Sequence, residues 1–158
     1  MNARTQQHTS VAWHYTTGQK FALIQKDGVL RPAHIGVLAS ERPVIWFSTN
    51  PVFEPTAAKA FVVDGVRRML TVREMYELAG GIVRLGCRIS RPKSGADLRK
   101  AAKMQPAIWN VLASVGKRLG ASPAEWWGYV GALMLDDLTV EMMNDDLTWS
   151  SHDARVFV

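Results

Sequence analysis

The chain has little cysteine and no long apolar run. Its single cysteine, Cys87, cannot form an intramolecular disulfide, and no histidine or second cysteine lies near it at the spacing of metal ligands. No apolar stretch approaches the roughly 20 residues that a membrane-spanning helix needs. Residues 1–10 lack the apolar core of a signal peptide. We therefore expect a cytoplasmic protein without a metal site or membrane contact, in which a flexible arm (residues 1–10) precedes one α+β domain (residues 11–158).

Several short catalytic signatures are also missing. The chain has no glycine-rich phosphate loop, no glycine fingerprint of dinucleotide-binding folds and no His-Glu-x-x-His zinc helix. These absences disfavour kinases, dinucleotide-fold dehydrogenases and zinc hydrolases. The net charge of +5 comes from scattered pairs of basic residues. Such pairs are typical of a solvated face, and they are also compatible with an anionic ligand or partner.

Hydrophobic periodicity predicts alternating strands and helices in the first part of the chain. Residues 11–16 alternate like a strand, and residues 19–26 place apolar side chains near helical spacing. Gly28 then fits the end of that helix. Residues 44–47 form an apolar run of the length of a buried strand, and the two prolines in residues 48–56 predict a loop. Such a loop, leaving a buried strand, is a common place for a functional site.

The middle of the chain contains a second helix signal and a second strand. Thr71 and Glu74 have the spacing of a capping box, which predicts a helix beginning there. Residues 82–89 alternate in polarity, so we expect a half-buried strand with Arg84 and Arg88 on its other face.

The last third of the chain is predicted to be helical first and then extended. Residues 95–120 have helical composition, with Pro106 suited to a first helical turn. We expect their apolar stripe to pack in the core, and it consists of Ile108, Leu112, Val115 and Leu119. A second capping box at residues 122–125 predicts only a short helix, because glycines follow closely. Strand composition returns at residues 138–142 and 147–150.

The order of these elements and of their polar side chains resembles a known superfamily. The first strand ends in His14-Tyr15-Thr16, the buried strand ends in Trp46-Phe47-Ser48-Thr49, and a late strand carries the isolated Glu141. This order is similar to that of the ADP-ribosyltransferase-like superfamily, which includes transferase toxins. The resemblance implies an α+β fold in which small mixed or antiparallel sheets form a cleft with flanking helices.

The resemblance also implies that NAD is a substrate and assigns roles to residues. In that superfamily the first strand binds the ribose of NAD, the aromatic-Ser-Thr motif shapes the nicotinamide pocket and a late glutamate assists bond cleavage. The catalytic residues would then be Glu141, His14 and Ser48. Glu141 would stabilise the positive charge that develops on the ribose, and Ser48 would hold the ribose or orient Glu141. The implied NAD-binding residues are His14, Tyr15, Thr16, Trp46, Phe47, Ser48, Thr49 and Arg84.

Other carboxylates and one departure from the superfamily pattern leave alternatives open. Glu54 lies just beyond the Ser-Thr motif and competes with Glu141, whereas Glu125 is already explained by its capping box. Arg84 fits a pyrophosphate ligand, and it also fits an ordinary half-exposed strand. Thr139 stands where toxins that modify arginine carry a second acidic residue. This departure argues against arginine as the acceptor.

Each assigned residue also has a purely structural interpretation. His14 also fits a core histidine bonded to a backbone carbonyl, and Trp46-Phe47 also fits the core. Ser48-Thr49 also fits a hydrogen-bonded turn, and Glu141 fits the polar position of a half-exposed strand.

We therefore keep two functional hypotheses. The first is an NAD-dependent ADP-ribosyltransferase-like enzyme that modifies a macromolecular acceptor, either a protein or a nucleic acid. The alternative is a non-catalytic binding module of a phage or mobile element. Such a module would bind a host protein or nucleic acid through its basic, tryptophan-rich surface.

Overall fold

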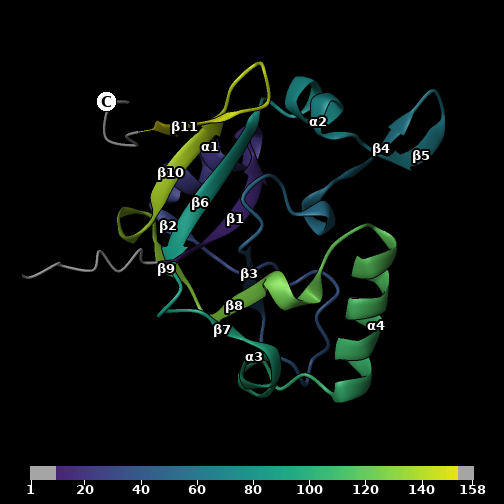
Figure 1. The fold of residues 1–158 in the computed structure, drawn as a ribbon, viewed down its shortest axis with the longest axis vertical. Coiled ribbons are helices and arrows are strands. Elements are labelled where there is room, and N and C mark those ends of the chain that lie inside the picture. The colour runs from purple at the N-terminus through teal and green to yellow at the C-terminus, as the bar shows by residue number, and fades with distance from the viewer. Residues whose placement is uncertain (1–9, 153–158) are drawn as a thin grey trace, which may run out of the picture.

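A seven-stranded antiparallel sheet organises residues 10–152, the part of the chain that the computed structural model describes (Figure 1). Its strands lie in the order β11-β10-β6-β1-β3-β8-β7. Their bounds are β1 Val11–Thr17, β3 Val44–Ser48, β6 Ile82–Arg88, β7 Lys93–Ser94, β8 Trp126–Val130, β10 Thr139–Met143 and β11 Trp149–His152. The mixed α and β class is therefore confirmed. Of the predicted arm at residues 1–10, only Ser10 lies within the described residues.

β1 is bonded very differently to its two neighbours in the sheet. Through all seven of its residues it pairs with β6. With β3, on the other side, it pairs only where Trp13 lies opposite Ser48. The two strands therefore separate over residues 14–17 and 44–47, although they are neighbours in one sheet. This separation leaves room between them for side chains and for a cleft.

α1 (Gly18–Asp27) forms where the helix over residues 19–26 was predicted, and it packs against the sheet through Phe21. The Thr17 hydroxyl accepts a hydrogen bond from the Lys20 amide at the start of the helix, and Gly28 ends it with a left-handed φ of +69°. β2 (Val29–Leu30) follows and pairs with β9 (Leu133–Met134) in a separate sheet. α1 contributes Phe21 to the core on this face, which also contains Ala12, Leu30, Ile45, Phe47, Val83, Leu85, Cys87, Leu133, Leu135, Leu138 and Val140.

A second core forms beside α2 (Val72–Leu78) and contains Tyr15, Phe53, Leu70, Met75, Ile82 and Met143. The predicted capping box begins this helix, because the Thr71 hydroxyl and the Glu74 carboxylate each accept from the other residue's amide. A hairpin of β4 (Ala60–Val63) and β5 (Val66–Met69) precedes α2 and projects from the molecule (Figure 1). This hairpin was not predicted from the sequence.

α3 (Gly95–Ala101) and α4 (Pro106–Arg118) divide the predicted helical region 95–120 at residues 102–105. Ile108 of the α4 stripe packs against a small core of Val44, Leu98, Ala102 and Met104, as expected. For the rest of the stripe the expectation is wrong, because Leu112, Val115 and Leu119 are 37%, 40% and 42% exposed. These three side chains instead line a cleft.

Two further local expectations are corrected. The residues of the second predicted capping box form only the 3-10 turn η2 (Pro123–Glu125), and the Ser122 side chain makes no capping bond. β8 begins directly afterwards. Arg84, expected on a half-exposed face, is buried at 7% exposure. The remaining short turns are η1 (Pro55–Ala57) and η3 (Leu135–Asp137), and no helix within residues 10–152 is long and apolar enough to cross a membrane.

Candidate functional site

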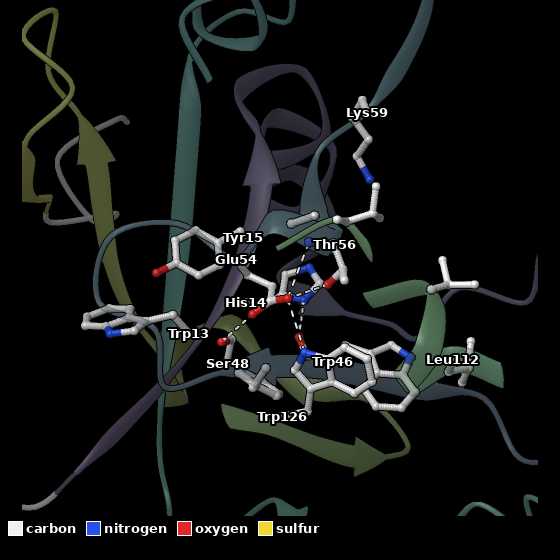
Figure 2. A pocket seen from close by; sticks show the side chains of 14 residues that line it. Trp13, His14, Tyr15, Trp46, Ser48, Glu54, Thr56, Lys59, Leu112 and Trp126 are labelled. Atoms are coloured by element: carbon white, nitrogen blue, oxygen red, sulfur yellow. Dashed lines mark hydrogen bonds between the residues drawn. The ribbon is translucent and has the colours of Figure 1, made fainter. Parts of the chain in front are cut away.

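A cleft of about 390 Å³ opens where β1 and β3 separate (Figure 2). Its volume lies in the range typical of small-molecule sites. Strand side chains, the segment after β3 and one side of α4 form its walls, which comprise Trp13, His14, Tyr15, Trp46, Phe47, Ser48, Glu54, Thr56, Ala57, Lys59, Leu112, Val115, Leu119 and Trp126. The walls are largely aromatic and aliphatic and carry a few polar groups, a composition that suits a planar organic ligand.

Glu54 is the carboxylate of this cleft, and it is buried. One oxygen, Oε2, accepts from the Ser48 hydroxyl at 2.7 Å. The other, Oε1, accepts from the Thr56 hydroxyl at 2.7 Å and from the Trp126 indole N–H at 3.1 Å. Every one of these partners donates, which matches an ionised carboxylate because that group only accepts. The four side chains thus fix a negative charge in the cleft wall.

His14 spans the gap between β1 and β3. Its Nδ1 lies 2.8 Å from the Trp46 carbonyl oxygen. A carbonyl only accepts, so Nδ1 carries the hydrogen and Nε2 is left as an acceptor in the neutral ring. The pKa of His14 is lowered to about 4, chiefly by burial, while the Trp46 carbonyl opposes this shift and the charges of Lys59 and Lys20 add to it. His14 is therefore neutral at physiological pH.

Three tryptophans form an aromatic cluster against the cleft. The ring centroids of Trp46, Trp109 and Trp126 lie 6.2–6.3 Å apart in tilted and edge-on contacts. Trp46 and Trp126 line the cleft, and Trp126 is also the residue that bonds Glu54. A flat ring bound here would meet aromatic faces and edges, and a positively charged ring would also be attracted by Glu54.

A cation lies at the other side of the cleft. Lys59 lines it just before the hairpin, and none of the ion pairs within residues 10–152 involves this ammonium group. Burial lowers the pKa of Lys59, and the charge of Lys20 lowers it further. A bound anion would offset both effects. The cleft thus presents a carboxylate and an ammonium group to one ligand.

The structure brings together five of the residues implied by the superfamily resemblance, namely His14, Tyr15, Trp46, Phe47 and Ser48. Thr16 is buried outside the cleft lining, and Thr49 donates its amide to the Glu125 carbonyl at 3.0 Å. Neither of these two lines the cleft. Ser48 does orient a glutamate by a hydrogen bond, but that glutamate is Glu54.

Glu141 and Arg84 lie outside the lining of this cleft. The Arg84 Nε donates to the Glu141 carboxylate at 2.7 Å, and Nη2 of the same guanidinium lies 2.5 Å from it. Glu141 lines a different hollow of about 660 Å³, together with Thr139, Ser151 and His152. Trp13 borders both hollows. Glu141 is therefore paired with an arginine and does not line the cleft that contains His14.

Sequence reasoning missed several residues of the cleft. Thr56 follows Glu54 by two residues, a spacing at which a hydroxyl can donate to the preceding carboxylate. This spacing could have predicted the contact between Thr56 and Glu54. Trp126 and Leu112 carry no local signal, because tertiary packing alone brings β8 and α4 to the site. No group of three or more His, Cys, Asp or Glu side chains within residues 10–152 is placed to hold a metal ion. No family model, curated protein or solved structure matches the chain.

Proposed function

We propose that this protein is an NAD-dependent enzyme of the ADP-ribosyltransferase-like type, and that Glu54 takes the role that the superfamily resemblance implies for Glu141. The observation that carries the proposal is the Ser48–Glu54 hydrogen bond of 2.7 Å in a cleft that also contains His14 and Tyr15. A serine that orients a carboxylate beside a histidine is the arrangement that the resemblance implies. Here the carboxylate comes from the loop after β3.

The chemistry fits the charges in the cleft. Nicotinamide in NAD is a positively charged planar ring, suited to the indoles of Trp46 and Trp126 beside Glu54. During transfer the bond between ribose C1′ and the ring nitrogen breaks, and its electron pair leaves with nicotinamide. An acceptor oxygen or nitrogen bonds C1′ and loses a proton. Positive charge grows on the ribose in the transition state, so a fixed carboxylate stabilises that state more than the ground state.

Two further residues have parts in this proposal. His14 is neutral, and its Nδ1–H is already bonded to Trp46, so Nε2 would accept from a ribose hydroxyl. Lys59 is the ammonium group that lines the cleft and would contact the pyrophosphate of NAD. Arg84 is not available for that part, because its guanidinium is bonded to Glu141 and to the carbonyl of Pro51.

The test is nicotinamide release from NAD by the purified protein, followed by liquid chromatography. We expect Glu54→Gln to lower kcat by about 100- to 1,000-fold, the cost of removing one preorganised charge-stabilising group. Glu77→Gln, an exposed carboxylate on α2, is the matched control and should leave kcat unchanged. Absence of both NAD binding and nicotinamide release in the wild-type protein would contradict the proposal, as would full activity of Glu54→Gln.

A second candidate function is supported by the distribution of charge. Residues 98–118, which include α4, contain five Lys or Arg and no Asp or Glu, whereas residues 119–152 contain six Asp or Glu and no Lys or Arg. In Figure 1, α3 and α4 lie on one side of the molecule, and β10 and β11 lie on the other. We propose that the basic side binds a polyanion, either as the acceptor of the enzyme or as the partner of a non-catalytic module.

A further inference from the structure

Three side chains from three strands bond three successive carbonyl groups of the turn that follows β3. The Tyr15 hydroxyl of β1 donates to the Asn50 carbonyl. The Arg84 Nη1 of β6 donates to the Pro51 carbonyl at 2.6 Å, and the Trp149 Nε1 of β11 donates to the Val52 carbonyl at 2.9 Å. Glu54 is two residues beyond the last of these carbonyls. We call residues 49–54 the glutamate turn.

The glutamate turn is also tied internally. The Asn50 side-chain oxygen accepts from the Val52 amide at 3.0 Å and from the Phe53 amide at 3.3 Å. The Ser48 hydroxyl oxygen accepts from the Asn50 amide at 3.1 Å and donates to Glu54 at 2.7 Å. These bonds make residues 48–54 one hydrogen-bonded unit. A shift of its carbonyls would therefore move the Glu54 carboxylate as well.

Arg84 is the most constrained of the three donors. Its guanidinium carbon lies 3.9 Å from the ring centroid of Trp13 and 4.5 Å from that of Trp149. Two of its nitrogens contact Glu141, and the third bonds Pro51. Burying a guanidinium is costly unless a counter-charge and hydrogen bonds satisfy it, and Glu141 supplies that charge. Glu141 thus permits a buried arginine to reach the turn.

We infer that Arg84 is a positioning residue that holds the glutamate turn and so aims Glu54 into the cleft, and that Glu141 acts through Arg84 rather than on the substrate. This inference rests on the proposed function for its catalytic consequence. Its structural part, that Arg84 orders the glutamate turn, stands independently. Glu141 therefore contributes to the site by holding the guanidinium of Arg84, whose N–H groups bond the glutamate turn.

A positioning role and a catalytic role for Glu141 predict opposite results for one substitution. Glu141→Gln keeps an oxygen that accepts from Arg84 while it removes the charge. A catalytic carboxylate would lose about 100- to 1,000-fold in kcat through this change. A residue that acts only through Arg84 would lose less than that, because a hydrogen bond still holds Arg84 although its counter-charge is gone.

Arg84→Met should have the larger effect. Methionine fills part of the space between the tryptophans and donates no hydrogen bond to Pro51. We expect kcat to fall by about 100-fold, the size of effect that a misplaced catalytic group produces, while KM changes little. Arg84→Lys keeps the charge but lacks the fork that bonds both Glu141 and Pro51, so its kcat should lie between wild type and Arg84→Met.

Hydrogen–deuterium exchange provides a readout that needs no NAD. In Arg84→Met and Arg84→Lys we expect faster exchange in peptides that cover the glutamate turn, and unchanged exchange in peptides of α1. The matched control is the Arg91–Asp137 pair, whose closest atoms are 3.5 Å apart at an exposed site. Arg91→Met should change neither the exchange of the glutamate turn nor kcat.

The outcomes separate the inference from the proposed function. Wild-type exchange of the turn in both Arg84 variants would overturn the inference, whether or not the protein cleaves NAD. A kcat for Glu141→Gln as low as that of Glu54→Gln would overturn it too, because Glu141 would then be catalytic. If the wild-type protein neither binds nor cleaves NAD, the proposed function fails, and the exchange of the glutamate turn alone decides whether Arg84 orders it.

Discussion

His14 makes the backbone contact of a core histidine and also lines the candidate cleft. The sequence left open whether it bonds a core carbonyl or faces a ligand. In the structure Nδ1 bonds the Trp46 carbonyl while the ring lines the cleft. The bond fixes the tautomer, in which Nε2 carries no hydrogen. Sequence periodicity places His14 on a strand but carries no information on which atom of the ring is bonded.

The buried neutral state of His14 makes the stability of the protein depend on pH. The pKa is about 4 in the folded protein and about 6.5 in the unfolded chain, so the unfolded chain binds the proton first as the pH falls. The contribution of His14 is complete above pH 6.5 and is lost between about pH 6.5 and 4. Its upper limit is about 3 kcal/mol of unfolding free energy.

His14→Gln should remove this part of the pH dependence, because glutamine does not titrate and its amide can still donate to Trp46. We expect urea unfolding curves at pH 7.5 and at about pH 4.5 to differ less for the variant than for the wild-type protein. His34→Gln, at an exposed loop position, serves as the control and should keep the wild-type difference. The expectation would be contradicted if the unfolding free energy fell by the same amount between pH 7.5 and about pH 4.5 in the wild-type protein and in His14→Gln.

At the scale of elements, the sequence predicted a helix end correctly where residues close in the chain make all the hydrogen bonds of the cap. The capping box at Thr71 and Glu74 and the glycine end of α1 formed as predicted. β8 was missed because Gly128 reads as a helix breaker. A side chain there would come within 2.5 Å of Val44 and 2.6 Å of Leu98, so this glycine permits close packing on the strand.

The candidate site was predictable only in part, because some of its residues follow local sequence patterns and others are brought in by contacts between distant strands. The His14 and Ser48 segments have local patterns, and both reached the cleft. The choice between Glu54 and Glu141 depends on pairing across β1, β6 and β10, where Glu141 lies opposite Arg84. The apolar stripe of α4 was assigned to the core because periodicity shows a face without showing what covers it.

α4 reaches the cleft through a glycine. A Cβ atom on Gly116 would lie 2.5 Å from Cζ2 and 2.6 Å from Cη2 of Trp126, the residue that bonds Glu54. Replacing a glycine by alanine within an exposed helix normally stabilises it by about 1 kcal/mol. Here we expect the opposite sign, because the ring and the helix must move apart, at a cost of roughly 1–3 kcal/mol.

The measurement for Gly116→Ala is the urea midpoint, together with the intrinsic fluorescence of the tryptophan cluster. A lower midpoint and altered fluorescence are expected. Ser114→Ala is the control, since it lies in the same helix at an exposed position. A midpoint above that of the wild-type protein would show that α4 does not depend on this close contact.

At the scale of the whole molecule, the separation of charge sets which partners can approach the cleft. Residues 98–124 contain five Lys or Arg and no Asp or Glu, and they include α4, one wall of the cleft. Within residues 119–152, the acidic residues lie mostly near β10 and β11. A polyanion is attracted to the α4 side and repelled by the other, so charge orients it before any specific contact forms.

This orientation predicts salt-dependent binding of a single-stranded oligonucleotide, measured by the fluorescence anisotropy of labelled oligo(dT). Lys117 and Arg118 are exposed in the last turn of α4. Reversing both charges to Glu should weaken binding and lower the slope of log K against log salt by at least about 0.7 for each phosphate that the variant no longer neutralises. Lys26→Glu, in the last turn of α1, is the control and should bind like the wild-type protein. Two results would rule out a polyanion site on the α4 side. One is an affinity that does not change with salt concentration, and the other is a loss of affinity in Lys26→Glu as large as that in the Lys117 and Arg118 variant.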